Sequence, residues 1–276
     1  MKRRTFLLGT GAVVIGGWLA RPGDHGAPYD DYFRALNEEL KKNGPMRPVM
    51  LIDLDRLDHN IDLIAASMKR SPVQPRHYRI VEKSVPCSKL IEYVSKRADT
   101  RRLMSFHQPF INDDAVAFPD ADILIGKPLP PRSAELFYKN LKGTTFDPAR
   151  QLQWLIDTPE NMQHYLELAK GLGTKMRINI EIDVGLHRGG VNNNGMLGQM
   201  LDQIAANPDR LEFSGFMGYD PQVGMGVPRI LGTHEELFKA AMARYQGFVD
   251  FTRGQYPKLW RDDLTLNTAG SPTYKL

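Results

Sequence analysis

The chain has 276 residues, of which 42% are hydrophobic and 25% are charged, so it is long enough to bury a large core. Its 36 basic and 32 acidic residues give a net charge of +4 and are spread along the chain, which excludes the basic tract typical of a nucleic-acid-binding protein. The single cysteine, Cys87, excludes an intrachain disulfide, and without Cys and His residues around it a structural zinc site is not indicated.

The first twenty residues have the pattern of a targeting segment. A basic start with Arg3 and Arg4 is followed by an apolar, glycine-containing run over 9–20. Paired arginines before a weakly hydrophobic run resemble a twin-arginine export signal, so we expect residues 1–27 to direct the chain to the periplasm. The run is shorter than a membrane span normally needs, yet it lacks a clear Ala-x-Ala cleavage site. An uncleaved inner-membrane anchor is therefore the alternative, and this segment is the only membrane contact we expect.

From Tyr29 onward, helical and strand patterns alternate. An amphipathic helix is predicted over 30–42 and ends before Gly44 and Pro45. Eight apolar strand candidates follow, at Val49–Leu54, Tyr78–Glu82, Arg102–Phe106, Ala121–Ile125, Leu152–Ile156, Met176–Asp183, Leu211–Met217 and Leu264–Asn267. Helical patterns between them lie at Leu57–Met68, Ser88–Ala98, Ser133–Leu141, Pro159–Leu172, Met196–Ala206 and Glu235–Arg253.

This alternation predicts the fold class. About 250 residues of alternating strand and helix, without a linker rich in Pro or Ser, match one (β/α)8 TIM barrel. We therefore expect residues 28–276 to form a single barrel domain. A doubly wound open sheet is the alternative, and it is disfavoured because no Gly-x-Gly-x-x-Gly follows the first strand candidate.

Polar residues at the carboxyl ends of the strand candidates carry the chemistry, because a barrel gathers those ends around one mouth. The second candidate ends at Lys83, and an unprotonated lysine can attack carbonyl groups. Further along, the strand ends run into the segments Asp183–Val191, Gly218–Asp220 and Asn267–Tyr274. Taken one at a time, a surface lysine, a tight glycine loop, a surface ion pair between Arg188 and Asp183 and a core-capping Tyr219 would explain them.

Taken together, these residues supply an amine, a cation, an aromatic face and a loop of small residues. Gly270, Ser271 and Thr273 lack bulk, so a phosphate can approach their backbone, as it commonly does at late loops of barrels. An aldehyde held there can condense with Lys83, and protein groups would set the electronics of its ring. The set therefore favours pyridoxal 5'-phosphate as a cofactor, with a cofactor-free barrel as the remaining alternative.

Five segments carry a family resemblance in their order and spacing: Leu51–Ile61, Arg79–Ser84, Ile182–Val191, Gly215–Asp220 and Gly270–Thr273. They resemble the pyridoxal-phosphate enzymes with the alanine racemase fold, most closely the branch of D-threonine aldolase and D-serine dehydratase. The resemblance implies a Schiff base on Lys83 and places Arg188 at the polar edge of the cofactor ring. It also implies that Tyr219 contacts the ring or the phosphate, that Gly270, Ser271 and Thr273 bind the phosphate, and that His187 lies nearby.

The resemblance implies a lyase that acts on D-amino acids by aldol cleavage or dehydration. An amino-acid racemase, and a barrel that holds pyridoxal phosphate for carriage or homeostasis without a reaction of its own, are the alternatives. Each reaction needs an acid, a base or a metal beyond Lys83.

Family members carry a β-rich domain after the barrel, and in the aldolase and dehydratase branch this domain supplies a His-x-Cys or His-x-Asp metal pair. This chain ends at Leu276 with no such pair after the barrel, so we expect either a truncated product or a barrel that works alone. A divalent metal is therefore implied by the family but has no ligands predicted in this chain. Homodimers are common in the family, so the resemblance makes a homodimer one option for this chain, although no residue of the sequence marks an interface.

Overall fold

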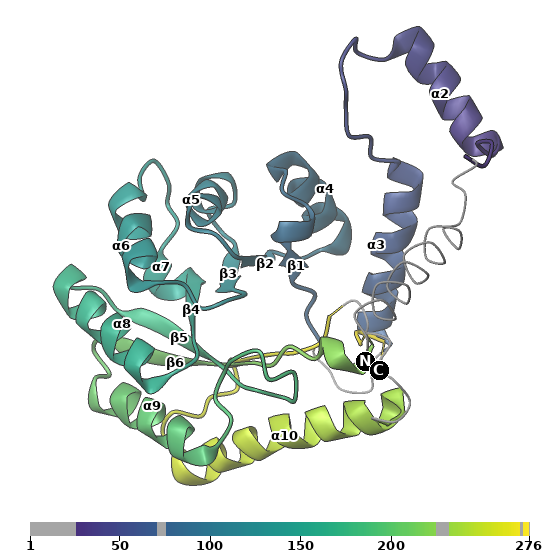
Figure 1. Cartoon of the computed structure of the whole chain (residues 1–276). Coiled ribbons are helices and arrows are strands. Elements are labelled where there is room, and N and C mark those ends of the chain that lie inside the picture. Colours follow the sequence, from purple (N-terminus) through teal and green to yellow (C-terminus); the bar gives the residue numbers. More distant parts are fainter. Residues whose placement is uncertain (1–25, 71–75, 225–231, 271–272, 276) are drawn as a thin grey trace, which may run out of the picture. The chain divides into compact units, whose positions relative to one another are not determined.

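The computed structural model describes residues 26–70, 76–224, 232–270 and 273–275 (Figure 1). It divides the chain into two compact units, Met1–Ile52 and Asp53–Leu276, so that residues 28–52, which we expected within the barrel domain, fall in the first unit. The predicted export signal or anchor, 1–27, lies outside the described residues except at its last two positions. Among the described residues, no helix is long and apolar enough to cross a membrane.

The first unit contains helix α2, Asp31–Asn43, which confirms the predicted amphipathic helix. The Asp30 side chain begins it by accepting a hydrogen bond of 2.9 Å from the Phe33 N–H, an N-cap that satisfies one of the free donors of the first turn. The helix ends at Gly44, before Pro45.

The second unit is built on a parallel sheet of seven strands in sequence order, curled with helices around its outside (Figure 1). The strands are β1 Ile80–Val81, β2 Arg102–Ser105, β3 Asp122–Ile125, β4 Leu152–Ile156, β5 Met176–Glu181, β6 Leu211–Met217 and β7 Thr265–Asn267. The helices are α3 Leu54–Lys69, α4 Ser88–Ala98, α5 Gln108–Ala117, α6 Pro131–Asn140, α7 Pro148–Gln151, α8 Pro159–Leu172, α9 Asn194–Ala206 and α10 His234–Gln255, with one-turn 3₁₀ helices η1 Glu82–Ser84 and η2 Pro221–Val223. The barrel-type α/β fold is confirmed.

One predicted strand, Val49–Leu54, is wrong. Residues 49–53 have no regular structure and α3 begins at Leu54. The reason is local, because the Asp53 side chain accepts the Arg56 N–H at 3.0 Å and thereby caps a helix where the apolar alternation predicted the end of a strand. The described part of the sheet consequently has seven strands, whereas eight were expected.

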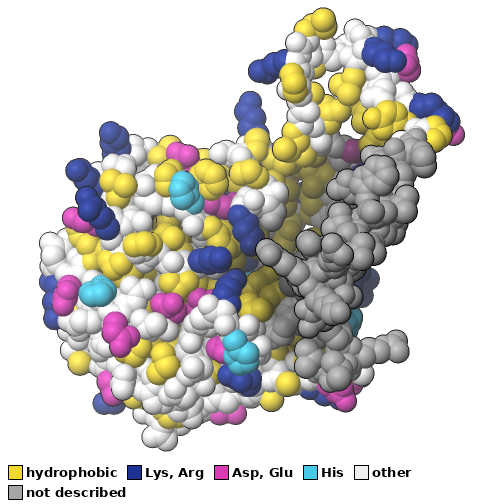
Figure 2. Space-filling view, in the orientation of Figure 1, with side chains coloured by type: hydrophobic (Ala, Val, Ile, Leu, Met, Phe, Trp, Pro, Cys, Tyr) yellow, Lys and Arg dark blue, Asp and Glu magenta, His cyan; other side chains and the backbone are white. Residues whose placement is uncertain are grey.

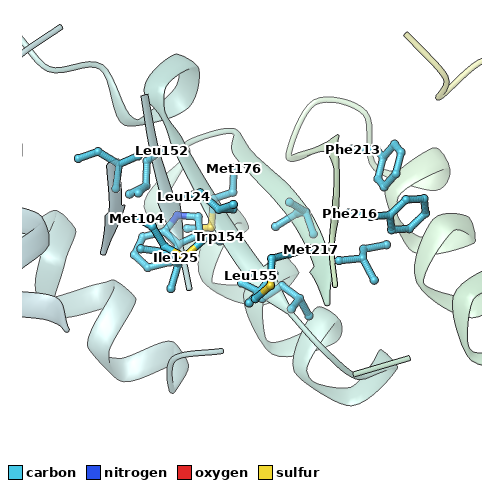
Figure 3. Close-up of a cluster of buried hydrophobic side chains, with 14 of the residues drawn as sticks. Met104, Leu124, Ile125, Leu152, Trp154, Leu155, Met176, Phe213, Phe216 and Met217 are labelled. Atoms are coloured by element: carbon cyan, nitrogen blue, oxygen red, sulfur yellow. The ribbon is translucent and has the colours of Figure 1, made fainter. Parts of the chain in front are cut away.

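The core of the second unit centres on β3 to β6, whose side chains are almost wholly buried (Figure 3). Trp154 on β4 is fully buried, and its ring centroid lies 5.7 Å from those of both Phe137 on α6 and Tyr165 on α8. The outer face of β4 therefore packs against these two helices. On the surface, basic, acidic and hydrophobic side chains are mixed over the face seen in Figure 2.

Polar side chains inside the curl hold strands that are not neighbours in the sheet. The Gln153 amide on β4 donates to Asp122 on β3 at 3.1 Å and to the Thr265 hydroxyl on β7 at 3.0 Å. Asn179 on β5 donates to the Thr265 carbonyl at 3.2 Å. β4 and β7 are separated by two strands in the sheet, so these contacts require the sheet to curl until side chains on its concave face reach one another.

Replacing Asp122 by asparagine is expected to lower the free energy of unfolding at pH 7 by about 3 kcal/mol, because it leaves the buried Arg79 guanidinium without its ion-pair partner. Burial opposes ionisation of Asp122, but Arg79 and Arg177 outweigh burial and hold its pKa below the ordinary value. The stabilisation that this depressed pKa reflects is fully present above the pKa that Asp122 has in the unfolded chain. It is lost as the pH falls through the lower pKa of Asp122 in the folded chain, so the difference in stability between variant and wild type should shrink in acid.

Urea unfolding at several pH values measures this effect. The matched control is Asp120→Asn, which removes an exposed ion pair with Arg101 and should change stability by less than about 1 kcal/mol. Equal effects of the two substitutions at pH 7 would contradict the role assigned to Asp122.

Candidate functional site

Lys83 lies just beyond the carboxyl end of β1, in the 3₁₀ turn η1, and its side chain is exposed. Its Nζ atom is 4.9 Å from the ring centroid of Phe106, which follows β2. That ring lies against Gly126, which follows β3, where any larger side chain would collide with it. Among the described residues, the Lys83 amine has no carboxylate partner. The strand ends of β1, β2 and β3 therefore present an unpaired amine above an aromatic ring.

Arg188 and Tyr219 form a second group at the ends of β5 and β6. The Arg188 guanidinium carbon is 4.9 Å from the Tyr219 ring centroid, and its Nη2 donates to Glu181 Oε1 at 2.9 Å. Burial raises the pKa of Glu181, while the Arg188 guanidinium limits the rise. Glu181, Asp183, Arg188 and Tyr219 line a small cavity at this end of the sheet. Glu181 thus binds one edge of the guanidinium and Tyr219 lies against its face. Within the described parts of the chain, its remaining N–H groups have no acceptor.

The loop that carries Arg188 is organised by Asp183. One carboxylate oxygen, Oδ1, accepts the N–H groups of Gly185 at 2.9 Å and His187 at 3.0 Å, and Oδ2 lies 2.6 Å from His187 Nδ1. Burial of Asp183 opposes its ionisation, but the His187 and Gly185 donors outweigh burial, so its pKa lies below the ordinary value. The surface ion pair between Arg188 and Asp183 is wrong, since Arg188 pairs with Glu181 and His187 pairs with Asp183.

The same loop closes on itself at Val191. Its N–H donates to the Glu181 carbonyl at 2.8 Å, and its carbonyl accepts the Asp183 N–H at 2.8 Å. Gly190 has a φ of +92°, and a Cβ there would lie 3.0 Å from the Glu181 carbonyl oxygen. The chain can therefore pass back alongside Glu181 only with glycine at this position. Arg188 is therefore presented by a loop fixed at both of its ends.

The predicted phosphate loop lies after β7, close to the end of β6. Ser271 lies outside the described residues, whereas Gly270 and Thr273 are described. The Gly270 N–H donates to Thr273 Oγ1 at 3.0 Å, and that hydroxyl donates to Asp220 Oδ1 at 2.9 Å. Burial raises the pKa of Asp220, and the Thr273 hydrogen bond partly offsets the rise. Asp220 thus holds this loop through Thr273, a role that was not predicted from the sequence.

The predicted residues fall into three groups at the same end of the sheet. Lys83 lies with Phe106, Arg188 with Tyr219, and Gly270 with Thr273. Tyr219 directly precedes Asp220, which joins the second group to the third. The Gly218 N–H donates to the Asn267 carbonyl at 3.0 Å, which fixes the ends of β6 and β7 together.

Comparison with known proteins identifies the family. Residues 52–259 match the family model described as the alanine racemase N-terminal domain. The chain belongs to this family. The family match spans β1 to β6 and α10 and therefore includes Lys83, Arg188 and Tyr219, but it ends before β7 and the loop with Gly270 and Thr273. No curated protein matches the sequence.

Several solved structures share the fold of this chain. Alanine racemase from Bacillus anthracis with bound L-Ala-P is 17% identical, with a TM-score of 0.60 over 83% of this chain and 54% of that one. D-threonine aldolase from Filomicrobium marinum is 17% identical, with a TM-score of 0.66 over 82% of this chain and 57% of that one. A variant of D-threo-3-hydroxyaspartate dehydratase is 16% identical, with a TM-score of 0.68 over 87% and 59%. At these identities the likeness shows the fold, and the chain spans between half and three fifths of each of these proteins.

The residues that sequence reasoning missed are the acids behind the predicted ligands. Glu181 ends β5, a fully buried strand, and a charge at a buried position is a signal that a partner is close. Asp220 directly follows Tyr219 and gave no such signal, because an aspartate after a strand is commonly exposed, whereas Asp220 is fully buried. Glu181 holds Arg188 and Asp220 holds Thr273, so these two acids fix predicted site residues to the ends of the strands.

Proposed function

We propose that this chain is a pyridoxal-phosphate enzyme of D-amino acid metabolism, a lyase of the aldolase or dehydratase type. The observation that carries the proposal is the Lys83 amine, which is exposed at the strand end and has no carboxylate partner among the described residues. Membership of the alanine racemase N-terminal domain family supports the cofactor. The choice of lyase over racemase rests on the sequence motifs around Lys83 and Arg188.

The side chains present fit this cofactor by their chemistry. A primary amine suits its aldehyde, and a guanidinium, with its several N–H donors, suits an acceptor on its ring. Tyr219 offers an aromatic face beside Arg188. When bound, pyridoxal phosphate supplies an electron-withdrawing ring that stabilises negative charge on the substrate Cα.

The chain's own residues would then have separate roles. Lys83 Nζ would bind the aldehyde and, once released by the incoming amino group, would carry a proton to or from the substrate Cα. Arg188, held by Glu181 and stacked on Tyr219, would orient the ring. The loop of Gly270, Ser271 and Thr273 would hold the phosphate. To donate to it, the Gly270 and Thr273 N–H groups would have to leave Thr273 Oγ1 and the Gly270 carbonyl, which accept them within the loop.

Turnover of D-serine and D-threonine, with and without a divalent cation, tests this function. We expect the purified chain to absorb in the visible after incubation with pyridoxal phosphate, and to release a 2-oxo acid from D-serine or glycine and an aldehyde from D-threonine. A chain that binds the cofactor but changes neither substrate would instead be a carrier. Interconversion of the enantiomers without either lyase product would favour a racemase.

A further inference from the structure

The residue before Lys83 is buried although Lys83 itself is exposed. Glu82 is only 2% exposed, and its Oε1 accepts a hydrogen bond from the Ser105 hydroxyl at the end of β2. Its carbonyl accepts the Val85 N–H at 2.7 Å, which closes the η1 turn. The side chain and the main chain of Glu82 therefore both anchor the turn that carries Lys83.

The direction of the two side chains follows from this anchoring. Glu82 and Lys83 are neighbours in a 3₁₀ turn, where three residues per turn place successive side chains about 120° apart. Glu82 reaches toward Ser105 and α5, while Lys83 lies over the Phe106 ring. Because the Glu82 side chain is held toward Ser105, the direction of the neighbouring Lys83 side chain is fixed as well, over Phe106, where the cofactor aldehyde is proposed to bind.

A second buried acid, Asp114 on α5, contacts Glu82 from the helix layer. Asp114 is 3% exposed, and burial first, followed by its hydrogen bond with Glu82, raises its pKa to about 9. The charge of Asp113 adds to the rise, and a hydrogen bond with Ser105 opposes it. Asp114 Oδ2 accepts no hydrogen bond within the described part of the chain, as expected of a protonated carboxyl group. Asp114 can therefore donate its proton to Glu82 at neutral pH.

We propose that Asp114 and Glu82 form a hydrogen-bonded carboxyl pair that positions Lys83 for covalent attachment of the cofactor. The inference rests on the proposed function for its purpose, but not for the structure of the pair. One shared proton leaves a single negative charge in the buried site. A second charge would repel the first at close range in a region with little water, and the turn would open to relieve it.

The direction of the pH dependence follows from the raised pKa. The folded chain keeps the Asp114 proton to higher pH than the unfolded chain, whose ordinary pKa is 3.8. Stability from the pair is therefore full in acid, declines as the pH rises above about 4 and is lost by about pH 9. Asp114→Asn keeps a donor toward Glu82 and cannot titrate, so this variant should lack that decline.

Hydrogen exchange in the cofactor-free chain tests the positioning. The amide of Val85 reports on the η1 turn directly, since it donates to the Glu82 carbonyl. At pH 7 we expect Glu82→Ala to speed exchange of the 83–87 segment by about tenfold or more, while the control Glu92→Gln, an exposed acid on α4, leaves it unchanged. Between pH 7 and 10, rates corrected for intrinsic exchange should rise in the wild type and stay flat in Asp114→Asn.

Two outcomes would overturn the proposal: unchanged exchange at the turn in a folded Glu82→Ala, or the same pH response in wild type and Asp114→Asn. The second comparison decides the matter if Glu82→Ala does not fold. Covalent labelling separates a failure of the proposed carboxyl pair from a failure of the proposed function. At pH 9.5, Lys83 in Asp114→Asn should be labelled by pyridoxal phosphate and borohydride faster than in the wild type. Absence of label at Lys83 in every variant at every pH would contradict the proposed function and leave the exchange result to stand alone.

Discussion

Replacing Lys83 by alanine is expected to abolish cofactor attachment and to lower turnover of any D-amino acid substrate by about a thousandfold or more. The amine is the one group on this chain proposed both to bind the aldehyde and to move a proton at the substrate Cα, so one substitution removes two roles. The fold should persist, because Lys83 is exposed and its contact is with the Phe106 ring.

The matched control is Lys89→Ala, the next lysine along the chain, which lies exposed on α4. Visible absorbance after addition of pyridoxal phosphate and the rate of product formation should both be lost in the first variant and kept in the second. Retention of both by Lys83→Ala would move the covalent site to another lysine.

The second large effect is expected at Arg188. Truncation to alanine removes a cation stacked on Tyr219 and leaves Glu181 buried without its partner. Hydrogen bonds to charged groups contribute about 1.5–3 kcal/mol, so the dissociation constant for pyridoxal phosphate should rise about 10- to 100-fold. Arg188→Lys should not restore binding, because an ammonium cannot reproduce the planar set of N–H donors.

A second stacked arginine provides the control. Arg253 lies 4.5 Å from the ring centroid of Trp260, away from the strand ends that carry the site. Arg253→Ala should leave cofactor affinity unchanged in an absorbance titration. If both truncations weaken binding equally, the effect reflects general loss of stability and Arg188 has no special role.

Much of the fold was predictable because most strands coincide with short apolar runs in the sequence. Leu152–Ile156 and Leu211–Met217 were predicted to the residue. Val49–Leu54 has the same character, but apolar alternation cannot show whether a partner strand is present or whether Asp53 will cap a helix. Helix α5 was missed because its buried face includes Gln108 and Asp114, which break the apolar stripe.

The location of the candidate site could be predicted from the sequence, but most contacts between its residues could not. Parallel topology alone brings strand ends to one edge, so Lys83, Arg188 and Tyr219 could be grouped from their places in the chain. The partners of these residues depend on the path of each loop and on side-chain rotamers. The Arg188 contact with Glu181 and the Thr273 contact with Asp220 therefore emerged only from the structure.

The most direct test of the account is to find where the cofactor attaches. The chain is incubated with pyridoxal phosphate, reduced with borohydride and digested, and the peptides are weighed by mass spectrometry. We predict the phosphopyridoxyl mass on the peptide that contains Lys83, with no such mass there in Lys83→Ala. A reduced cofactor found only on other lysines, or on none, would contradict the central claim that Lys83 is the covalent residue of this barrel.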